Sequence, residues 1–567
     1  MDGLQRRGRQ SAVRAYGLVR VGAVAGTCAV LGGACRSQGN DGTAPAKPHA
    51  APAPSGSASL LNPPHGLGLQ PVTVPDFSAM EVSVRDQMRA RYSLLAAQIE
   101  HPGTNPAELG TAYGELGELL MAATYFDAAE ACYLNAEALA PADVRWPYFL
   151  GQLYKAKGPL AKSAASFEKA RHLRPDDVAT LVWLGEVYLL QGRSDAAEPL
   201  FTQALTLDST SAAAHFGAGR AALARKDYAG AVTHLEKALA LDPQATASHY
   251  QLAMAYRGRG ELSKAEAQLR QKGDIEPRPA DPLMRQLDDL LQSAEAYNVR
   301  GGRELDAGNW AAAAEDFRKG LELRPADPSL RHRLGTALYQ SGNVSGAVEQ
   351  FQQVIRTSPE YAKAHFSLGV VMEAGGRHAE AIEHLLNALK YDPAYIQARA
   401  QLAGVLARSG RPQEARGHYE RVLEMDPTLK DAVFGYAMTL VRLHQYQQAR
   451  DRLAEAMKVY PEDPVFAHTL ARLLAAAPDA RVRDGSRAKA LIDELLKKQQ
   501  SIELGETAAM TLAELGEYEQ AAAVQRDLIA AAEKAGLRDV VRHMAGNLRL
   551  YERRQPCRTP FTDDELP

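Results

Sequence analysis

The chain has 567 residues, more than one hydrophobic core organises, so it contains several domains or a repetitive array. Its hydrophobic content of 46%, its low aromatic content of 7% and its long Ala/Leu/Glu/Arg stretches at helical spacing favour an all-α protein. The net charge of -3 excludes the strongly basic surface that is typical of nucleic-acid-binding proteins.

The first 34 residues have the pattern of an export signal. Five Arg stand there against one Asp, and an uncharged apolar stretch at 21–34 follows. This stretch is shorter than the roughly 20 residues that span a membrane. Its end, Leu31-Gly32-Gly33-Ala34-Cys35, resembles a bacterial lipobox, which implies a lipid on Cys35. Because Leu31 lies one position further from the cysteine than is usual, ordinary cleavage and a retained anchor remain alternatives.

Two segments precede the regular part of the chain. Residues 35–75 are rich in Ala, Pro, Ser and Gly and bury too little apolar surface to fold, so we predict a disordered tether. Residues 76–109 include an amphipathic stretch. We expect a capping helix there, because the end of a repeat array otherwise exposes an apolar face.

A pattern of 34 residues then recurs. With Val178 as position 1, a small residue stands at position 8 from Gly117 to Ala253 and, after a slip of 14 residues, from Gly301 to Ala471. Position 24 is large, position 15 is glycine in seven repeats, and proline stands near position 32 in most. Glycine ends a first helix in the left-handed conformation, and small residues let the second helix approach closely. The unit is therefore a helix-turn-helix.

These offsets resemble the consensus of the tetratricopeptide repeat (TPR), most clearly in LVWLGEVYLLQGRSDAAEPLFTQALTLD at 181–208. The resemblance implies an all-α superhelical solenoid of about twelve repeats in two blocks. Repeats 1 to 5 are expected at 110–277 and repeats 6 to 12 at 294–533. A connector helix at 278–293 is expected to separate the blocks, and a capping helix and tail at 534–567 to end the chain.

The resemblance also implies a binding groove. In the family, positions 2, 5, 9 and 12 of each first helix point into a concave face. Position 5 is often aromatic in this chain, and arginines stand at positions 9 and 12, a combination that suits a peptide ligand. The candidate groove residues are Tyr148, Phe216, Arg220, Tyr250, Arg257, Phe366 and Phe434. The alternative, that some of these rings simply pack between neighbouring repeats, fits the same pattern.

No catalytic or cofactor motif stands out in the sequence. HExxH, GxSxG and P-loop patterns are missing, and the histidines recur at positions 4 and 23, which the repeat itself explains. We therefore expect a non-enzymatic scaffold or adaptor without cofactor or metal, which binds a protein or peptide and no nucleic acid. The export signal predicts a periplasmic, membrane-anchored lipoprotein of the bacterial cell envelope. The alternative is a subunit that recruits a separately encoded redox or glycan-processing enzyme.

Overall fold

The structure is a computed structural model that describes residues 59–64, 67–101, 103–562 and 565–566. The predicted export signal, Cys35 and the tether up to residue 58 lie outside the described residues. The described part divides into two compact units, one up to Arg300 and one from Gly301 onwards. It is 73% helical with 27 helices, which confirms the predicted all-α class. None of these helices combines the length and the apolar character that a membrane span requires.

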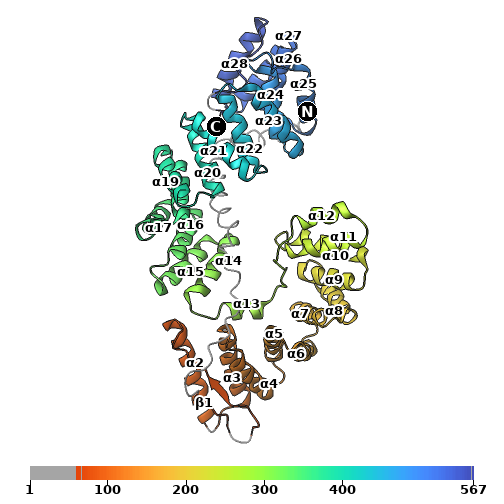
Figure 1. The fold of residues 1–567 in the computed structure, drawn as a ribbon, viewed down its shortest axis with the longest axis vertical. Coiled ribbons are helices and arrows are strands. Elements are labelled where there is room, and N and C mark those ends of the chain that lie inside the picture. Colours follow the sequence, from red (N-terminus) through yellow and green to blue (C-terminus); the bar gives the residue numbers. More distant parts are fainter. Residues whose placement is uncertain (1–58, 65–66, 102, 563–564, 567) are drawn as a thin grey trace. The chain divides into compact units, whose positions relative to one another are not determined.

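The first unit contains five antiparallel helix pairs with additional elements at both ends (Figure 1). Each pair is one repeat, and consecutive pairs contact each other. The elements are β1 (Ser59–Leu61), β2 (Val72–Val74), α2 (Val82–Glu100), α3 (Pro106–Ala122), α4 (Phe126–Leu139), α5 (Arg145–Lys157), α6 (Leu160–Leu173), α7 (Val178–Leu190), α8 (Ser194–Leu207), α9 (Ala212–Ala224), α10 (Tyr228–Leu241), α11 (Ala247–Gly258), α12 (Leu262–Leu269) and α13 (Pro282–Asp288).

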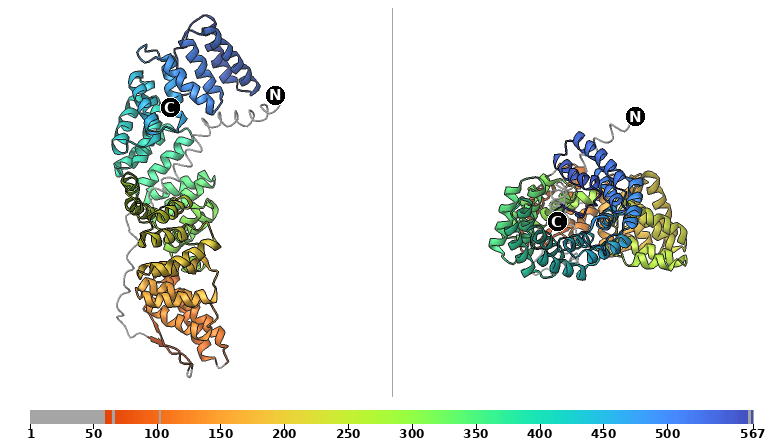
Figure 2. Two further views of the ribbon diagram at one scale, coloured as in Figure 1. Left: turned by 90° about the vertical axis from the view of Figure 1, so that its right-hand side faces the viewer. Right: turned by 90° about the horizontal axis from the view of Figure 1, so that it is seen from above.

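Seven further pairs follow, from α14 and α15 to α26 and α27, and then a final helix α28. The first of these helices, α14, begins before the boundary at Gly301, and the other helices lie in the second unit. Figure 2 shows the helices within each unit stacked as successive pairs. The elements are α14 (Ala294–Asp306), α15 (Trp310–Leu323), α16 (Pro328–Gln340), α17 (Val344–Thr357), α18 (Ala362–Ala374), α19 (His378–Tyr391), α20 (Ile396–Arg408), α21 (Pro412–Met425), α22 (Lys430–Arg442), α23 (Tyr446–Val459), α24 (Pro464–Ala476), α25 (Gly485–Lys498), α26 (Ile502–Glu514), α27 (Tyr518–Lys534) and α28 (Arg538–Glu552).

The small residue at position 8 is required by the large residue at position 24 of the same repeat. A Cβ added to Gly185 would lie 2.7 Å from the ring of Phe201, which is fully buried. Gly151 has the same relation to Phe167, and Gly335 to Phe351, at 2.7 Å and 2.6 Å. The ring of the second helix thus rests on the bare backbone of the first, which holds the two helices close.

The turn between the two helices imposes a left-handed residue at position 15. The predicted glycines adopt it, with φ of +103° at Gly158 and +74° at Gly192. In three other repeats Thr124, Lys226 and His444 stand there, with φ between +58° and +66°. The helix geometry therefore dictates this conformation even where the side chain disfavours it.

One glycine allows a test of this packing in which the direction of the stability change is clear. Gly217, in α9, faces Phe201 of the preceding repeat, and an added Cβ would lie 2.1 Å from its ring. We expect Gly217→Ala to destabilise the first unit by about 1–3 kcal/mol, although alanine favours helices over glycine by about 1 kcal/mol. The control is Gly417→Ala in α21, where nothing lies within 4 Å and a gain in stability is expected. Urea unfolding measures both, and a gain at Gly217 would contradict the packing.

The predicted tether is wrong from Ser59 onwards. β1 pairs antiparallel with β2, and Val72 is fully buried. Between the strands and the repeats, the side chain of Asn135 in α4 exchanges two hydrogen bonds of 2.8 Å with the backbone of Gln70. The segment therefore adds to the first repeat, because its few apolar residues find partners on α4 that the composition does not reveal.

The start of the first repeat also differs slightly from the prediction. α2 packs on α3, as expected for a capping helix, with Phe77 and Tyr92 buried. α3 begins at Pro106, before the predicted start of repeat 1 at residue 110. The side chain of Asn105 accepts a hydrogen bond from the backbone N–H of Ala107 at 2.9 Å, so an N-cap followed by proline fixes this start.

Candidate peptide-binding surface

The connector at 278–293 does more than separate two blocks. Only Pro282–Asp288 is helical, and this helix, α13, packs on α3 (Figure 1). Before it, Asp281 accepts hydrogen bonds from the hydroxyl of Tyr148 in α5 and, at 2.8 Å, from the indole N–H of Trp183 in α7. After it, the carbonyl of Leu290 accepts a hydrogen bond of 2.8 Å from Gln87 in α2. The connector thus crosses the first helices of repeats 1 to 3.

This crossing removes one predicted groove residue from the accessible surface. Tyr148 is buried, and its ring packs edge-on against Phe167 with centroids 5.7 Å apart. Burial and the neighbouring Asp281 carboxylate raise the pKa of the Tyr148 hydroxyl well above its ordinary value. The groove prediction is therefore wrong for Tyr148, because a segment of the same chain already occupies that stretch.

Three other predicted groove rings lie mainly between repeats. Phe216 is buried in the core of repeats 4 and 5, and Phe366 is buried against Tyr395 with centroids 5.0 Å apart. Phe434 is half-buried and meets Phe466 of the next repeat edge-on at 6.1 Å. Packing between neighbouring repeats, the alternative drawn from sequence, therefore describes these three rings.

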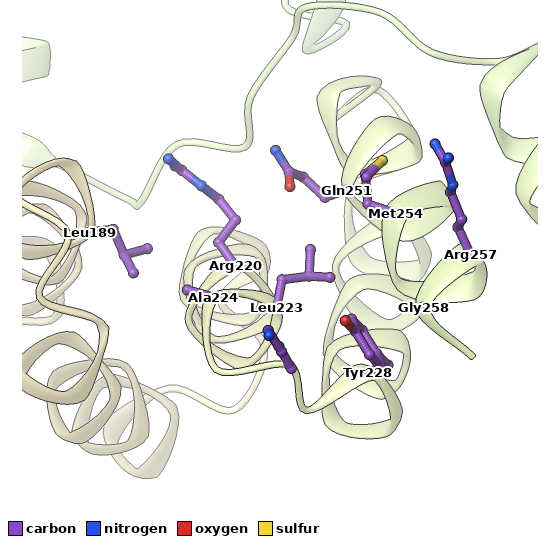
Figure 3. Close-up of a pocket in the computed structure, with 10 residues that line it drawn as sticks. Leu189, Arg220, Leu223, Ala224, Tyr228, Gln251, Met254, Arg257 and Gly258 are labelled. Carbon is purple, nitrogen blue, oxygen red and sulfur yellow. The ribbon is translucent and has the colours of Figure 1, made fainter. Parts of the chain in front are cut away.

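The remaining candidates gather on repeats 4 and 5. Tyr250 is 47% exposed, Arg257 is exposed, and Arg220 is half-buried. Arg220 and Arg257 line one pocket of about 770 Å³ between α9 and α11. Figure 3 shows Gln251 and Met254 between the two arginines. The lining residues are Leu189, Arg220, Leu223, Ala224, Lys226, Tyr228, Gln251, Met254, Arg257 and Gly258.

The pocket combines cations with an apolar wall. Arg220 lies 3.7 Å from Glu186, and that carboxylate also binds Lys155. No carboxylate pairs with Arg257 or Lys226 within the described part of the chain. Guanidinium groups bind carboxylates through paired hydrogen bonds, and the leucines beside them accept an apolar side chain. The arrangement can therefore hold an acidic residue next to an apolar one.

The arginines of the pocket were predicted from the sequence, but most residues of its apolar wall were not. Leu189 and Leu223 stand at position 12 of their repeats, as Arg257 does, so position 12 read along consecutive repeats would have identified them. No repeat position pointed to Tyr228. Its ring lies against Gly258, where an added Cβ would be 2.3 Å away, and this contact depends on how successive pairs are stacked.

Comparison with known families settles the class of protein. Sequence models described as the tetratricopeptide repeat match residues 115–178, 150–213, 184–246 and 332–394, and a second set matches 222–287, 372–417 and 406–473. The chain belongs to the tetratricopeptide-repeat family. As a TPR protein it is a scaffold for protein interaction, and TPR repeats generally bind protein or peptide partners.

Solved structures resemble the chain at low identity. The TPR domain of P58(IPK) is 17% identical, with 73% of this chain and 98% of that chain covered and a TM-score of 0.25. A structure of pilF of Pseudomonas aeruginosa is 21% identical, with 38% of this chain and 96% of that chain covered and a TM-score of 0.34. Yeast Tom70 is 15% identical, with 62% of this chain and 92% of that chain covered and a TM-score of 0.28. No curated protein sequence matches the chain.

Proposed function

We propose that this chain is an adaptor of the bacterial cell envelope that holds an acidic segment of a partner protein in the pocket between α9 and α11. The observation that carries the proposal is the pair Arg220 and Arg257, which lie on consecutive first helices and line one pocket. The exposed ring of Tyr250 lies on the second of these helices. Tyr148, Phe216 and Phe366 at position 5 are buried, whereas Tyr250 at the same position is 47% exposed and can add an aromatic contact. Aromatic and arginine side chains are the residues that most often dominate binding energy at protein interfaces.

The charge of this pocket is the property to test. We expect the double variant Arg220→Glu and Arg257→Glu to weaken partner binding at least about 100-fold, since two attractive contacts become repulsive. A photo-crosslinking amino acid at Tyr250 in the native cell would identify the partner, and the affinity of that partner for the purified variants gives the measurement.

A matched variant controls for net charge. Lys237→Glu in α10 with Arg270→Glu after α12 makes the same charge change at exposed residues that do not line the pocket. This variant should keep the partner's affinity within about twofold and, like the wild type, should bind more weakly with added salt as the attraction is screened. In the Arg220→Glu and Arg257→Glu variant added salt should instead relieve the repulsion. Equal losses in the two double variants would refute the pocket.

The membrane anchor is a separate part of the proposal. We propose that Cys35 carries the lipid and that the segment after it links the repeats to the membrane. A single acyl chain gives only marginal membrane binding, whereas two chains give stable attachment. We expect Cys35→Ala to move the chain from the membrane fraction to the soluble fraction, with mass spectrometry of the wild-type N-terminus as the direct check. Unchanged membrane association of the variant would defeat the anchor and leave the pocket untouched.

A further inference from the structure

The C-terminal tail folds back over the first helices of repeats 12, 11 and 10. After α28, Arg558 donates a hydrogen bond of 2.5 Å to Glu514 at the end of α26. Further along the tail, Glu565 forms an ion pair of 2.9 Å with Arg472 in α24. The carbonyl of Leu566 then accepts a hydrogen bond of 3.4 Å from Arg442 in α22. The tail therefore meets three consecutive repeats in order.

Arg472 is the anchor of this contact. The residue is 4% exposed, and its guanidinium lies between Glu565 and Glu506, with the second pair at 3.4 Å. The ring of Phe561 lies 5.5 Å from the same guanidinium. A buried cation needs opposite charge at short range, and the closer of its two carboxylates comes from the tail. The repeats thus present a site that a carboxylate completes.

The apolar part of the tail fills the space beside this ion pair. Cys557 and Pro560 are buried, and Phe561 and Leu566 pack on the core formed by repeats 9 to 12. Glu565 itself stays 38% exposed, so this end of the tail lies at the surface. From Phe561 the sequence reads FTDDELP, with three acidic residues among seven. The chain's own tail is therefore an acidic peptide with aromatic and aliphatic contacts.

The same repeat position binds carboxylate in both units. Arg472 stands at position 9 of its repeat, and so does Arg220 in the first unit. In each case the arginine lies on a first helix, and Arg472 shows that this position accepts a glutamate from an extended segment. In the second unit the side chain bound at this position is Glu565, so the ligand group that the position binds is a carboxylate.

We propose that the surface of α22, α24 and α26 is a second peptide-binding site, which the tail occupies in the free chain. Its partner ligand is an extended acidic peptide with an aromatic residue four positions before a glutamate, as in Phe561 and Glu565, and it binds by displacing the tail. This site is distinct from the pocket at Arg220 and Arg257, so either proposal can fail alone. A short tether gives the tail an effective concentration of about 1 mM, which sets the competition that a partner must overcome.

A labelled peptide with the sequence of residues 556–567 tests the site by fluorescence anisotropy. The receptors are the exported chain with its tail intact, the same chain carrying Phe561→Ala and Glu565→Ala, and a chain that ends at Cys557. We expect the peptide to bind the two altered chains at least about tenfold more tightly than the intact chain, whose own tail competes. Circular dichroism confirms that the receptors are folded, and the point variants retain the test if truncation unfolds α24.

The decisive control changes the peptide and leaves the protein as it is. A peptide with Glu565→Lys should bind the altered chains at least about tenfold more weakly, because it repels Arg472. Equal binding of the two peptides, no binding, or equal binding to intact and altered chains would overturn the proposal. Sedimentation gives the remaining outcome: an intact chain that is a dimer and becomes a monomer without the tail would place the tail in a second copy, which also overturns it.

Discussion

Replacing Asp281 by alanine is expected to destabilise the first unit by about 3–5 kcal/mol and to free the connector. Its carboxylate accepts hydrogen bonds from Tyr148 and, at 2.8 Å, from Trp183, and a further one of 3.0 Å from the backbone of Met284 at the start of α13. Hydrogen bonds to charged groups contribute about 1.5–3 kcal/mol each. Urea unfolding followed by fluorescence measures the loss, because Trp183 is one of only three tryptophans in the chain.

A second aspartate, Asp227, serves as a control that distinguishes the hydrogen bonds from Tyr148 and Trp183 from simple helix capping. Asp227 caps α10 through a hydrogen bond of 3.0 Å to the backbone of Gly230, without a tyrosine or tryptophan partner. Asp227→Ala should cost only about 1 kcal/mol, the usual loss for an N-cap. The difference between the two variants is the contribution of Tyr148 and Trp183. Equal losses would show that the hydrogen bonds from Tyr148 and Trp183 contribute nothing beyond the helix cap.

The fold follows from the sequence because each repeat encodes its own contacts. Gly185 and Phe201 touch within one repeat, and Gly192 ends its first helix with a φ of +74°. These contacts span few residues and recur every 34 positions, so their spacing identifies the helix pairs directly. The same reasoning covers His444, whose positive φ follows from its place in the turn.

The binding surface follows only in part, because distant segments cover it. Position 5 correctly places Tyr148 on a first helix, but Asp281 covers it from 133 residues further along the chain. Glu565 reaches Arg472 across 93 residues in the same way. No local spacing encodes such contacts, since they depend on where a connector or tail returns after the repeats have stacked. The surface at Arg220 and Arg257 was predictable because both arginines belong to adjacent repeats and line the pocket themselves.

Acidification is expected to destabilise the second unit through His468, by up to about 3 kcal/mol between pH 6.5 and about 4. Burial, and to a lesser extent the charge of the nearby Arg472, lowers the pKa of His468 from its ordinary 6.5 to about 4. Below pH 6.5 the unfolded chain therefore binds a proton at His468, whereas the folded chain does not bind it until the pH falls to about 4. The stabilisation is fully present above pH 6.5 and is lost as the pH falls, at about 1.4 kcal/mol per pH unit.

The neighbouring groups do not offset this loss. The hydrogen bond to Glu506 raises the pKa of His543 above 6.5, so its contribution is already complete below that pH and is lost only as the pH rises through the raised value. The pKa of Glu506 lies below its ordinary 4.5, because hydrogen bonding to His543 and the charge of Arg472 outweigh its burial. Its contribution therefore disappears only when the pH falls through that lowered value. His468 alone of these three weakens the unit between pH 6.5 and 4.5.

His468→Gln isolates the effect, because glutamine can keep the 2.9 Å hydrogen bond to Thr507 and does not titrate. We expect urea unfolding followed by far-ultraviolet circular dichroism to show a flatter stability profile below pH 6.5 for this variant. The control is His444→Asn, which removes an exposed histidine of the same unit and suits its φ of +58°. This control should retain the wild-type slope. Identical slopes in His468→Gln and the wild type would show that the proton is taken up elsewhere, and the burial of His468 would then have no part in the acid sensitivity of the unit.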